Sequence, residues 1–155
     1  LARVKLGLQQ TVQLGNLNAK RDWGHSRDYV EAIWRILQHH KPDDFVIATG
    51  QTHTVRAFVE ETAKHFDMDI VWEGEHLEEN GIDRKTGKVV VEVHPAYFRP
   101  AEVEFLQGDA AKARNLLNWQ PKVTFKELAA IMAKSDFEVV KKEAMVGKKF
   151  EIHHT

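Results

Sequence analysis

The sequence predicts an α/β fold, and three observations support that prediction. Apolar residues recur at helical spacing from Ser26 onward, an uninterrupted apolar run occupies residues 45–48, and helical spacing returns from Val55. Helix, strand and helix in this order, with short joins, are typical of a sheet covered by helices. The apolar run lies between two acidic residues and a Thr-Gly pair, which is typical of a strand buried on both faces. We therefore expect a parallel strand at residues 45–48.

Composition narrows the class of protein. The chain has 155 residues, of which 43% are hydrophobic, enough for one globular domain with its own core. Lys and Arg number 22 against 23 Asp and Glu, so the broad positive field of a duplex-binding protein is missing. The absence of cysteine excludes disulfides and thiolate metal sites and fits a reducing compartment. No apolar run approaches the roughly 20 residues that span a bilayer. We expect a cytoplasmic protein without nucleic-acid or membrane partners.

The N-terminal part of the chain predicts a strand, a polar loop and a helix. Residues 1–8 have the pattern of the end of an amphipathic helix without an N-cap, so we expect a piece of a longer polypeptide. Residues 11–14 alternate as a short strand does, and the Gly- and Asn-rich residues 15–22 predict an exposed loop. Ser26 is a suitable N-cap for the next helix. The apolar side of that helix is expected to be Tyr29, Val30, Ile33, Trp34 and Leu37.

The remaining elements follow from the same patterns. We expect a helix at residues 55–66, strands at 69–72 and 88–93, an exposed polar excursion at 73–88 between those strands, and a short helix from Asp109 to Leu117. Thr124 and Glu127 form a capping box for a last helix that continues to Ala144. Its inner face is expected to be Phe125, Leu128, Ala129 and Met132. Residues 1–140 are expected to form the folded part, and residues 141–155 a frayed tail.

Residues 14–30 carry the first chemical signal. Lys20 and Arg21 lie between a strand end and a helix start, where α/β proteins bind ligands, and an arginine offers paired donors suited to phosphate. This arrangement favours an anionic ligand. Another interpretation stays open from local sequence, in which Arg21 and Arg27 form weak surface ion pairs with their neighbouring aspartates.

The histidines are weak candidates for chemistry. His25 stands between a glycine and a serine at a helix entrance, where ordering the turn is favoured over general-base catalysis. The doublets at residues 39–40 and 153–154 lack zinc-like spacing, because adjacent helical residues point about 100° apart. We predict no metal site.

The second chemical signal lies at residues 94–109. Arg99 precedes Pro100, which biases the arginine backbone toward an extended conformation, so that its side chain can be aimed at a ligand. A second phosphate contact is one interpretation. The other is that Arg99 pairs with Glu102 or Glu104, beside two core aromatics.

Two catalytic signatures are missing. No Gly-x-Gly-x-x-Gly loop follows a predicted strand, so no dinucleotide-binding fingerprint lies in these residues. Neither tyrosine, Tyr29 or Tyr97, has a lysine four positions later.

Three blocks of sequence resemble a known family. Residues 14–34, 43–60 and 97–132 are similar, in order and spacing, to the C-terminal part of the GDP-mannose 4,6-dehydratase family of extended short-chain dehydrogenases/reductases. The resemblance implies the substrate-binding part of such an enzyme with the last elements of its Rossmann domain, the N-terminal Rossmann half being absent.

The resemblance also implies an activity for the full-length protein. Family members convert GDP-mannose to GDP-4-keto-6-deoxymannose, a step toward GDP-fucose, by internal hydride transfer through NADP with loss of water. Their NADP loop and catalytic Tyr and Lys belong to the N-terminal half. We therefore expect no catalytic or cofactor-binding residue in this chain, an inactive chain when alone, and a homodimer or homotetramer in full-length form.

Substrate contacts are carried over position by position. In the first loop the resemblance suggests that Gly15 and Asn16 approach the nucleoside and that Lys20 and Arg21 bind the GDP moiety. From the second stretch Arg99, with Glu102 nearby, closes the site. Two charge-assisted contacts of this kind contribute roughly 1.5–3 kcal/mol each.

Two other functions stay open at this level. The chain could belong to another nucleotide-sugar epimerase or reductase of the same superfamily. It could also be a non-catalytic fragment that binds nucleotide sugars.

Overall fold

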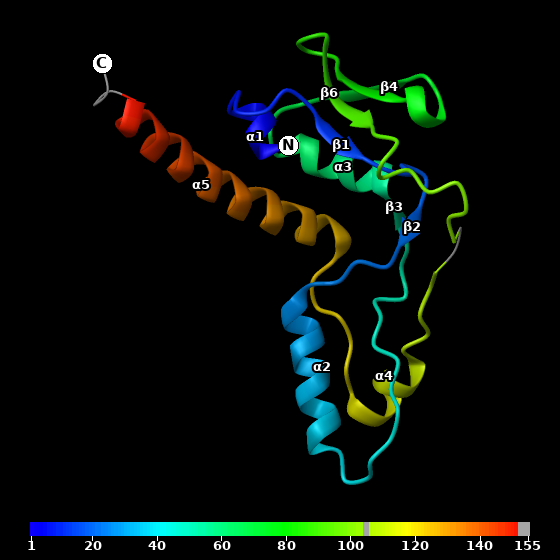
Figure 1. Cartoon of the computed structure of the whole chain (residues 1–155). Helices are drawn as coiled ribbons and strands as arrows, with labels where there is room; N and C mark the ends of the chain where they lie inside the picture. Colours follow the sequence, from blue (N-terminus) through cyan, green and yellow to red (C-terminus); the bar gives the residue numbers. More distant parts are fainter. Residues whose placement is uncertain (104–105, 152–155) are drawn as a thin grey trace.

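The computed structural model describes residues 1–103 and 106–151, and it confirms a mixed α/β fold (Figure 1). The helices are α1 (Ala2–Lys5), α2 (Ser26–Gln38), α3 (Val55–Lys64), η1 (His76–Glu78), α4 (Ala111–Leu117) and α5 (Phe125–Glu151). The strands are β1 (Val12–Leu14), β2 (Lys20–Arg21), β3 (His53–Thr54), β4 (Ile70–Glu73), β5 (Asn80–Asp83) and β6 (Lys88–Val93).

The larger sheet has four strands in the order β1-β6-β5-β4, with β1 parallel to β6 and the other pairs antiparallel. The predicted strands at residues 11–14, 69–72 and 88–93 are confirmed as β1, β4 and β6 to within a residue. The predicted excursion at residues 73–88 is exposed at residues 73–78 and 84–88, but the prediction of exposure was wrong for residues 79–83. The excursion contains β5, where the buried Asp83 carboxylate accepts hydrogen bonds from the Asp69 and Lys85 amides and the Thr86 hydroxyl. These bonds let a polar hairpin complete the sheet.

The molecule has two lobes that meet where α2 and α5 diverge (Figure 1). In one lobe α5 packs against α1 and α3, and α3 covers the sheet through Val59, which contacts Val90 and Val91. In the other lobe α2 lies beside α4 around Trp119, which is 1% exposed. The predicted helix at residues 55–66 is thus confirmed, with Val59 and Phe66 buried.

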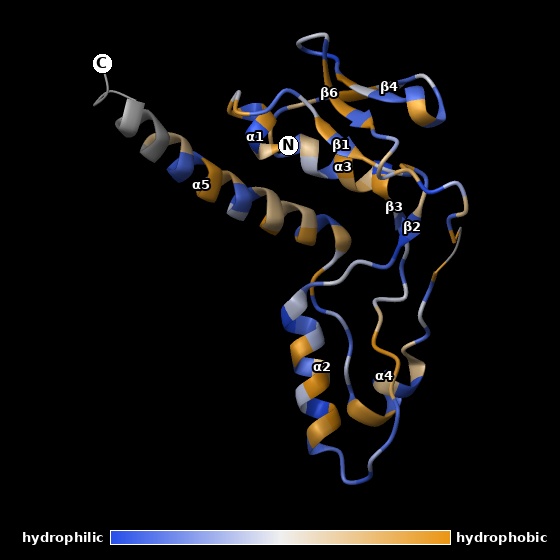
Figure 2. Ribbon diagram, in the orientation of Figure 1, coloured by the Kyte–Doolittle hydropathy of each residue, from blue (hydrophilic) through white to orange (hydrophobic). Residues whose placement is uncertain are grey.

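Helix α2 differs from expectation in its cap and in its buried face. His25, and not Ser26, is the N-cap, because its Nδ1 accepts a hydrogen bond from the Arg27 amide at 3.2 Å. The fully buried residues are Asp28 and Ala32. The expected apolar side is largely exposed, by 57–75% at Val30, Ile33, Trp34 and Leu37. Apolar colour along α2, at the edge of the molecule, is visible in Figure 2.

Residues 45–48 do not form the predicted parallel strand. They run without strand pairing between the end of α2 and β3, beside α4 (Figure 1). Phe45 and Ile47 pack on the core around Trp119, whereas Val46 is 54% exposed. A strand needs hydrogen bonds from a neighbour, and no strand among the described residues lies next to this segment.

The C-terminal helices agree better with the sequence patterns. The Asp109 carboxylate accepts a hydrogen bond from the Ala111 amide, and the capping box of Thr124 and Glu127 is confirmed by reciprocal bonds at 2.8 and 3.3 Å. On α5, Leu128 and Ala129 are buried, but Met132 is 43% exposed, so its assignment to the inner face was wrong.

Helix α5 continues to Glu151, beyond the expected end at Ala144, while residues 152–155 of the predicted tail lie outside the described residues. The division at residue 140 stays a prediction. Within the described residues no helix is both long and apolar enough to cross a membrane.

Candidate binding site at the β1 and β6 loops

Parallel pairing of β1 and β6 brings the two chemically marked stretches together. Leu14 is in register with Val93, so both strands end at the same edge of the sheet. The His94 amide donates a hydrogen bond to the Leu14 carbonyl at 2.8 Å, directly past the strand ends. The loops that follow, residues 15–19 and 94–103, therefore leave the sheet side by side although some 80 positions separate them in sequence.

Gly15 marks the tightest approach between these loops. A Cβ atom at this position would lie 2.1 Å from the Tyr97 carbonyl oxygen, far inside van der Waals contact. Only glycine lets the backbone of the first loop come this close to the turn of the second. Whether Gly15 also approaches a nucleoside stays a prediction.

Asn16 and Arg99 are joined directly. The Asn16 Nδ2 group donates to the Arg99 carbonyl at 2.8 Å, and the Asn16 Oδ1 atom accepts from the Arg99 amide at 2.7 Å. The orientation of the carboxamide is unambiguous, because a backbone N–H only donates and a carbonyl only accepts. The two residues that the sequence marked in separate stretches thus form one unit.

Arg21 and Glu102 form the second junction. An Nη2 to Oε1 distance of 2.5 Å joins them, and the Glu102 side chain is only 18% exposed. The hydrogen bond from Arg21, with the charge of Arg99 adding to it, holds the pKa of the Glu102 carboxyl below its ordinary value of 4.5. Both arginines therefore favour the ionised form of the Glu102 carboxyl.

These contacts decide how Arg21 is paired, whereas Glu104, one of the two partners left open for Arg99, lies outside the described residues. Arg21 pairs across the site with Glu102 and not with its neighbour Asp22. Asp22 instead accepts hydrogen bonds from the Thr49 amide and hydroxyl and from the Gly50 amide, at 2.6–3.1 Å. The local ion-pair interpretation was thus wrong for Arg21.

Lys20 and Arg21 are held by strand pairing. They form β2, which pairs with β3 in the register Lys20 to Thr54 and Arg21 to His53. Successive side chains of a strand point to opposite faces, so Lys20 is exposed while Arg21 turns toward Glu102. The two cations therefore face different surroundings.

The loop before β2 is less exposed than expected. Leu17 and Ala19 are 3% and 8% exposed, and their carbonyls accept hydrogen bonds from the amides of Arg56 and Val55 at the start of α3. After β2, Trp23 stacks on Phe58 at a centroid distance of 5.0 Å. The residues before and after β2 (Lys20–Arg21) are thus both held by contacts with α3.

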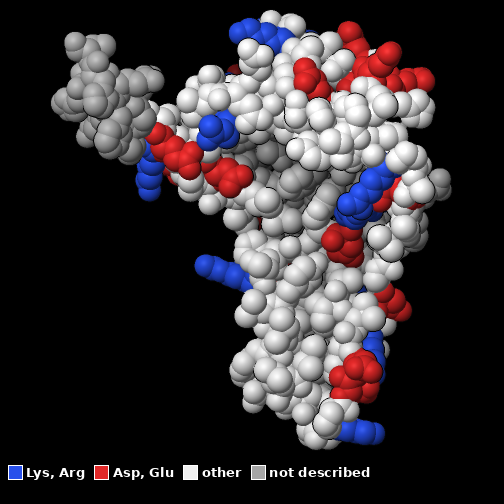
Figure 3. All heavy atoms as spheres, viewed as in Figure 1, with Lys and Arg blue, Asp and Glu red and all other residues white. Residues whose placement is uncertain are grey.

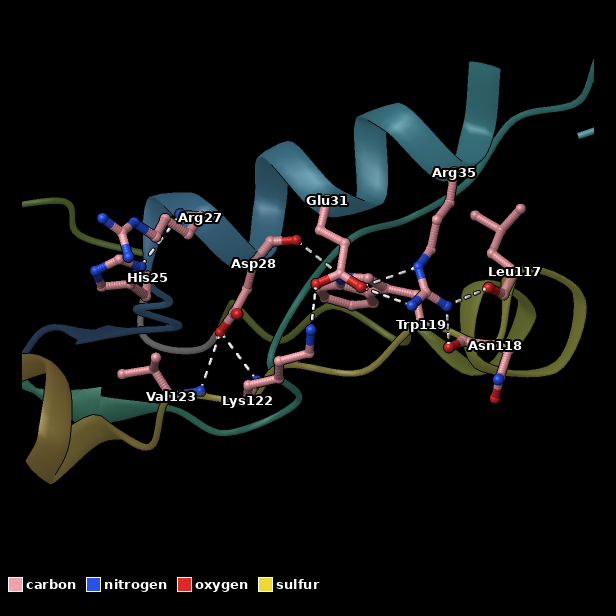
Figure 4. A network of polar contacts seen from close by, with 10 residues as sticks. All are labelled: His25, Arg27, Asp28, Glu31, Arg35, Leu117, Asn118, Trp119, Lys122 and Val123. Carbon is pink, nitrogen blue, oxygen red and sulfur yellow. Dashed lines mark hydrogen bonds and ion pairs between the residues drawn. The ribbon is translucent and has the colours of Figure 1, made fainter. Parts of the chain in front are cut away.

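A polar network that sequence patterns missed fixes the start of α2 (Figure 4). The Asp28 carboxylate is 4% exposed and accepts the amides of Lys122 and Val123 at 3.0 and 3.1 Å, while its own carbonyl accepts the Trp119 indole at 2.8 Å. The only available signal was an acidic residue in the first helical turn, which is common at solvent-exposed positions. His25 lies at the entrance of this network as a cap, in agreement with its predicted role in ordering the turn.

The charge distribution fits a local site rather than a broad basic surface. On the face in Figure 3 basic and acidic side chains alternate, and acidic groups gather at the end of the sheet that carries β4. Among residues 1–103 and 106–151, no cluster of three or more His, Asp or Glu side chains could hold a metal ion.

Comparison with known proteins identifies the family. A sequence profile described as GDP-mannose 4,6 dehydratase matches residues 1–132. The chain belongs to the GDP-mannose 4,6-dehydratase family. Over 130 residues it is 56% identical to GDP-mannose 4,6 dehydratase of Drosophila melanogaster, covering 84% of this chain and 33% of the relative. Over 141 residues it is 52% identical to the human protein of that name, covering 91% and 38%. The chain thus spans a third to two fifths of the length of these GDP-mannose 4,6-dehydratases and matches their C-terminal part.

Solved structures share the fold at lower identity. RMD from Pseudomonas aeruginosa, solved with NADPH, has a TM-score of 0.66 at 22% identity, covering 89% of this chain and 39% of that one. A dTDP-glucose 4,6-dehydratase from Bacillus anthracis has a TM-score of 0.60 at 20% identity, covering 86% and 36%. These likenesses show that the chain has the fold of part of each of these proteins, in agreement with the predicted α/β class.

Proposed function

We propose that this chain is the GDP-sugar-binding part of a GDP-mannose 4,6-dehydratase. The observation that supports it most is that the loops after β1 and β6 meet through the Asn16–Arg99 and Arg21–Glu102 contacts, in a member of that family. Two guanidinium groups, Arg21 on β2 and Arg99 in the loop after β6, suit the two phosphates of GDP, since each arginine offers paired donors. Gly15 and Asn16 lie in the loop after β1, and Lys20, on the opposite face of β2 from Arg21, is a further proposed contact to the GDP moiety.

The chemistry itself belongs to another part of the full-length protein. GDP-mannose loses water and becomes GDP-4-keto-6-deoxymannose, and NADP supplies the internal hydride transfer. We assign NADP binding mainly to the N-terminal half, because none of the strand-to-helix turns among the described residues is the Gly-rich loop that holds a dinucleotide pyrophosphate. The role of this chain is to bind and orient the nucleotide end of the substrate, and alone it is inactive.

This assignment also accounts for two features of the structure: the exposed apolar side of α2 and the unpaired residues 45–48. In the full-length protein we propose that the nucleotide-binding half covers both, supplying the strand neighbour and the apolar surface that residues 1–103 and 106–151 do not provide. We also propose that the full-length protein is cytoplasmic, contributes to the supply of GDP-fucose and assembles as a homodimer or homotetramer.

Activity of the full-length protein tests the reaction. With NADP and GDP-mannose, a 4-keto-6-deoxy product is expected, and its absence would show that the assignment to this reaction is wrong. Competition among GDP, UDP and dTDP tests the base, with GDP expected to bind most tightly.

Variants test the diphosphate contacts. Arg21→Ala or Arg99→Ala should weaken GDP binding by roughly tenfold or more, because each removes a charge-assisted contact. Arg27→Ala is the matched control, since Arg27 is exposed on α2. Unchanged affinity in both site variants would disprove the proposed diphosphate contacts.

A further inference from the structure

The carboxamide of Asn16 engages both polar backbone groups of a single residue, Arg99. It donates to the carbonyl at 2.8 Å and accepts from the amide at 2.7 Å, as a neighbouring strand would. Bonds to the amide and the carbonyl of one residue fix the peptide planes on both sides of it, and with them the direction in which its side chain leaves the backbone.

Other constraints converge on the same backbone. Pro100 restricts Arg99 to extended conformations. Before it, the amides of Tyr97 and Phe98 donate to the His94 carbonyl at 3.0 and 3.1 Å, which closes a turn. Arg99 itself is exposed, so its backbone is held while its guanidinium stays accessible to a ligand. Fixing a binding group before the ligand arrives reduces the entropy that binding must otherwise overcome.

We infer that Asn16 is a positioning residue that acts on the ligand through Arg99, rather than chiefly through a contact of its own with the nucleoside. This inference rests on the proposed function, because it treats Arg99 as the ligand contact. It also gives the first loop a second role: Gly15 lets the turn approach, and Asn16 then holds it.

Hydrogen exchange of the Arg99 backbone amide tests, without any ligand, whether Asn16 holds the Arg99 backbone. Asn16→Ala should speed exchange of the Arg99 amide by roughly tenfold or more, since its acceptor is gone. Asn16→Asp keeps an oxygen that accepts from this amide, so exchange should stay near the wild-type rate. Asn18→Ala is the matched control in the same loop, because Asn18 accepts a hydrogen bond from Arg56 and not from Arg99. Exchange in Asn16→Ala that matches wild type would overturn the inference.

A double-variant cycle then tests the link to binding. If Asn16 acts through Arg99, then Asn16→Ala, Arg99→Ala and the double variant should all raise the Kd for GDP by a similar factor. A direct nucleoside contact predicts losses that multiply, and that result would overturn the positioning role. A wild-type protein that binds GDP no better than UDP would instead overturn the proposed substrate class, while the exchange data still decide the role of Asn16.

Discussion

At the scale of single residues, the site depends on backbone approach as much as on charge. Gly15 has no functional group, yet its lack of a side chain allows the contact with the Tyr97 carbonyl that sets the two loops together. The sequence marked Gly15 as a substrate contact through family resemblance. The structure adds a steric reason for glycine that holds with or without substrate.

Replacing this glycine tests the steric reason. Gly15→Ala should lower the free energy of unfolding by about 2 kcal/mol and weaken GDP binding, because the new methyl group forces the two loops apart. Gly7→Ala is the control, since Gly7 has a φ of 71° but open space around it and should cost only about 1 kcal/mol of backbone strain. Equal costs and unchanged GDP affinity would contradict the crowding argument.

The pair of Arg21 and Glu102 predicts a pH dependence. Because the pKa of Glu102 is lower in the folded chain than its ordinary 4.5, the carboxylate stabilises the fold above that value. This contribution is lost as the pH falls through the lowered pKa. Denaturant unfolding of wild type and Glu102→Gln should therefore differ at neutral pH and converge in acid below 4.5. A difference that stays constant with pH would show that the charge of Glu102 is unimportant.

At the scale of elements, one buried carboxylate connects α2 to the segment that leads into α5. The Asp28 carboxylate accepts hydrogen bonds from the amides of residues 122 and 123, and this links the start of α2 to the segment before α5 (Figure 4). Arg35 adds a second tie near the other end of α2, through the carbonyl of Leu117 at 2.9 Å.

Removal of the Asp28 carboxylate should be costly. Asp28→Ala leaves two amides without an acceptor in a buried setting, so the free energy of unfolding should fall by about 3 kcal/mol. The exposed Asp44, replaced by alanine, should change it by less than about 0.5 kcal/mol. Thermal and denaturant unfolding of both variants measure the difference in the free energy of unfolding. A small effect of Asp28→Ala would mean that water accepts the two amide hydrogen bonds in place of the carboxylate.

At the scale of the whole molecule, the apolar surface is not fully covered. Four apolar side chains are exposed along α2, namely Val30, Ile33, Trp34 and Leu37. Val46, in the segment that follows α2, is exposed as well. Contiguous apolar surface of this kind drives association in water.

Self-association of the isolated chain is therefore expected. The double change Trp34→Ser and Leu37→Ser should reduce it, in sedimentation velocity measured over a range of concentrations, with little loss of stability because both side chains are exposed. Ile36→Ser is the matched control, since Ile36 packs on the core around Trp119 and its replacement should destabilise the fold. A wild-type chain that stays monomeric at high concentration would contradict the prediction.

Local patterns predicted the elements that depend on neighbours in sequence. Helix α3, strand β6 and the capping box of Thr124 and Glu127 follow from spacing and from bonds within a few residues. The patterns failed where an outcome depends on distant partners. The polar residues of β5 became a strand because Asp83 is satisfied internally, and residues 45–48 stayed unpaired because the part of the chain that the structure describes has no strand next to them.

The sequence by itself determined the family, most of the helices and strands, and the charged residues of the candidate site, since these depend on residue identity and spacing. Only the tertiary structure decided how those residues meet. Parallel pairing of β1 and β6 placed Asn16 against Arg99 and Arg21 against Glu102, some 80 positions apart in the chain. Such contacts arise from strand register and loop direction, which no local pattern encodes.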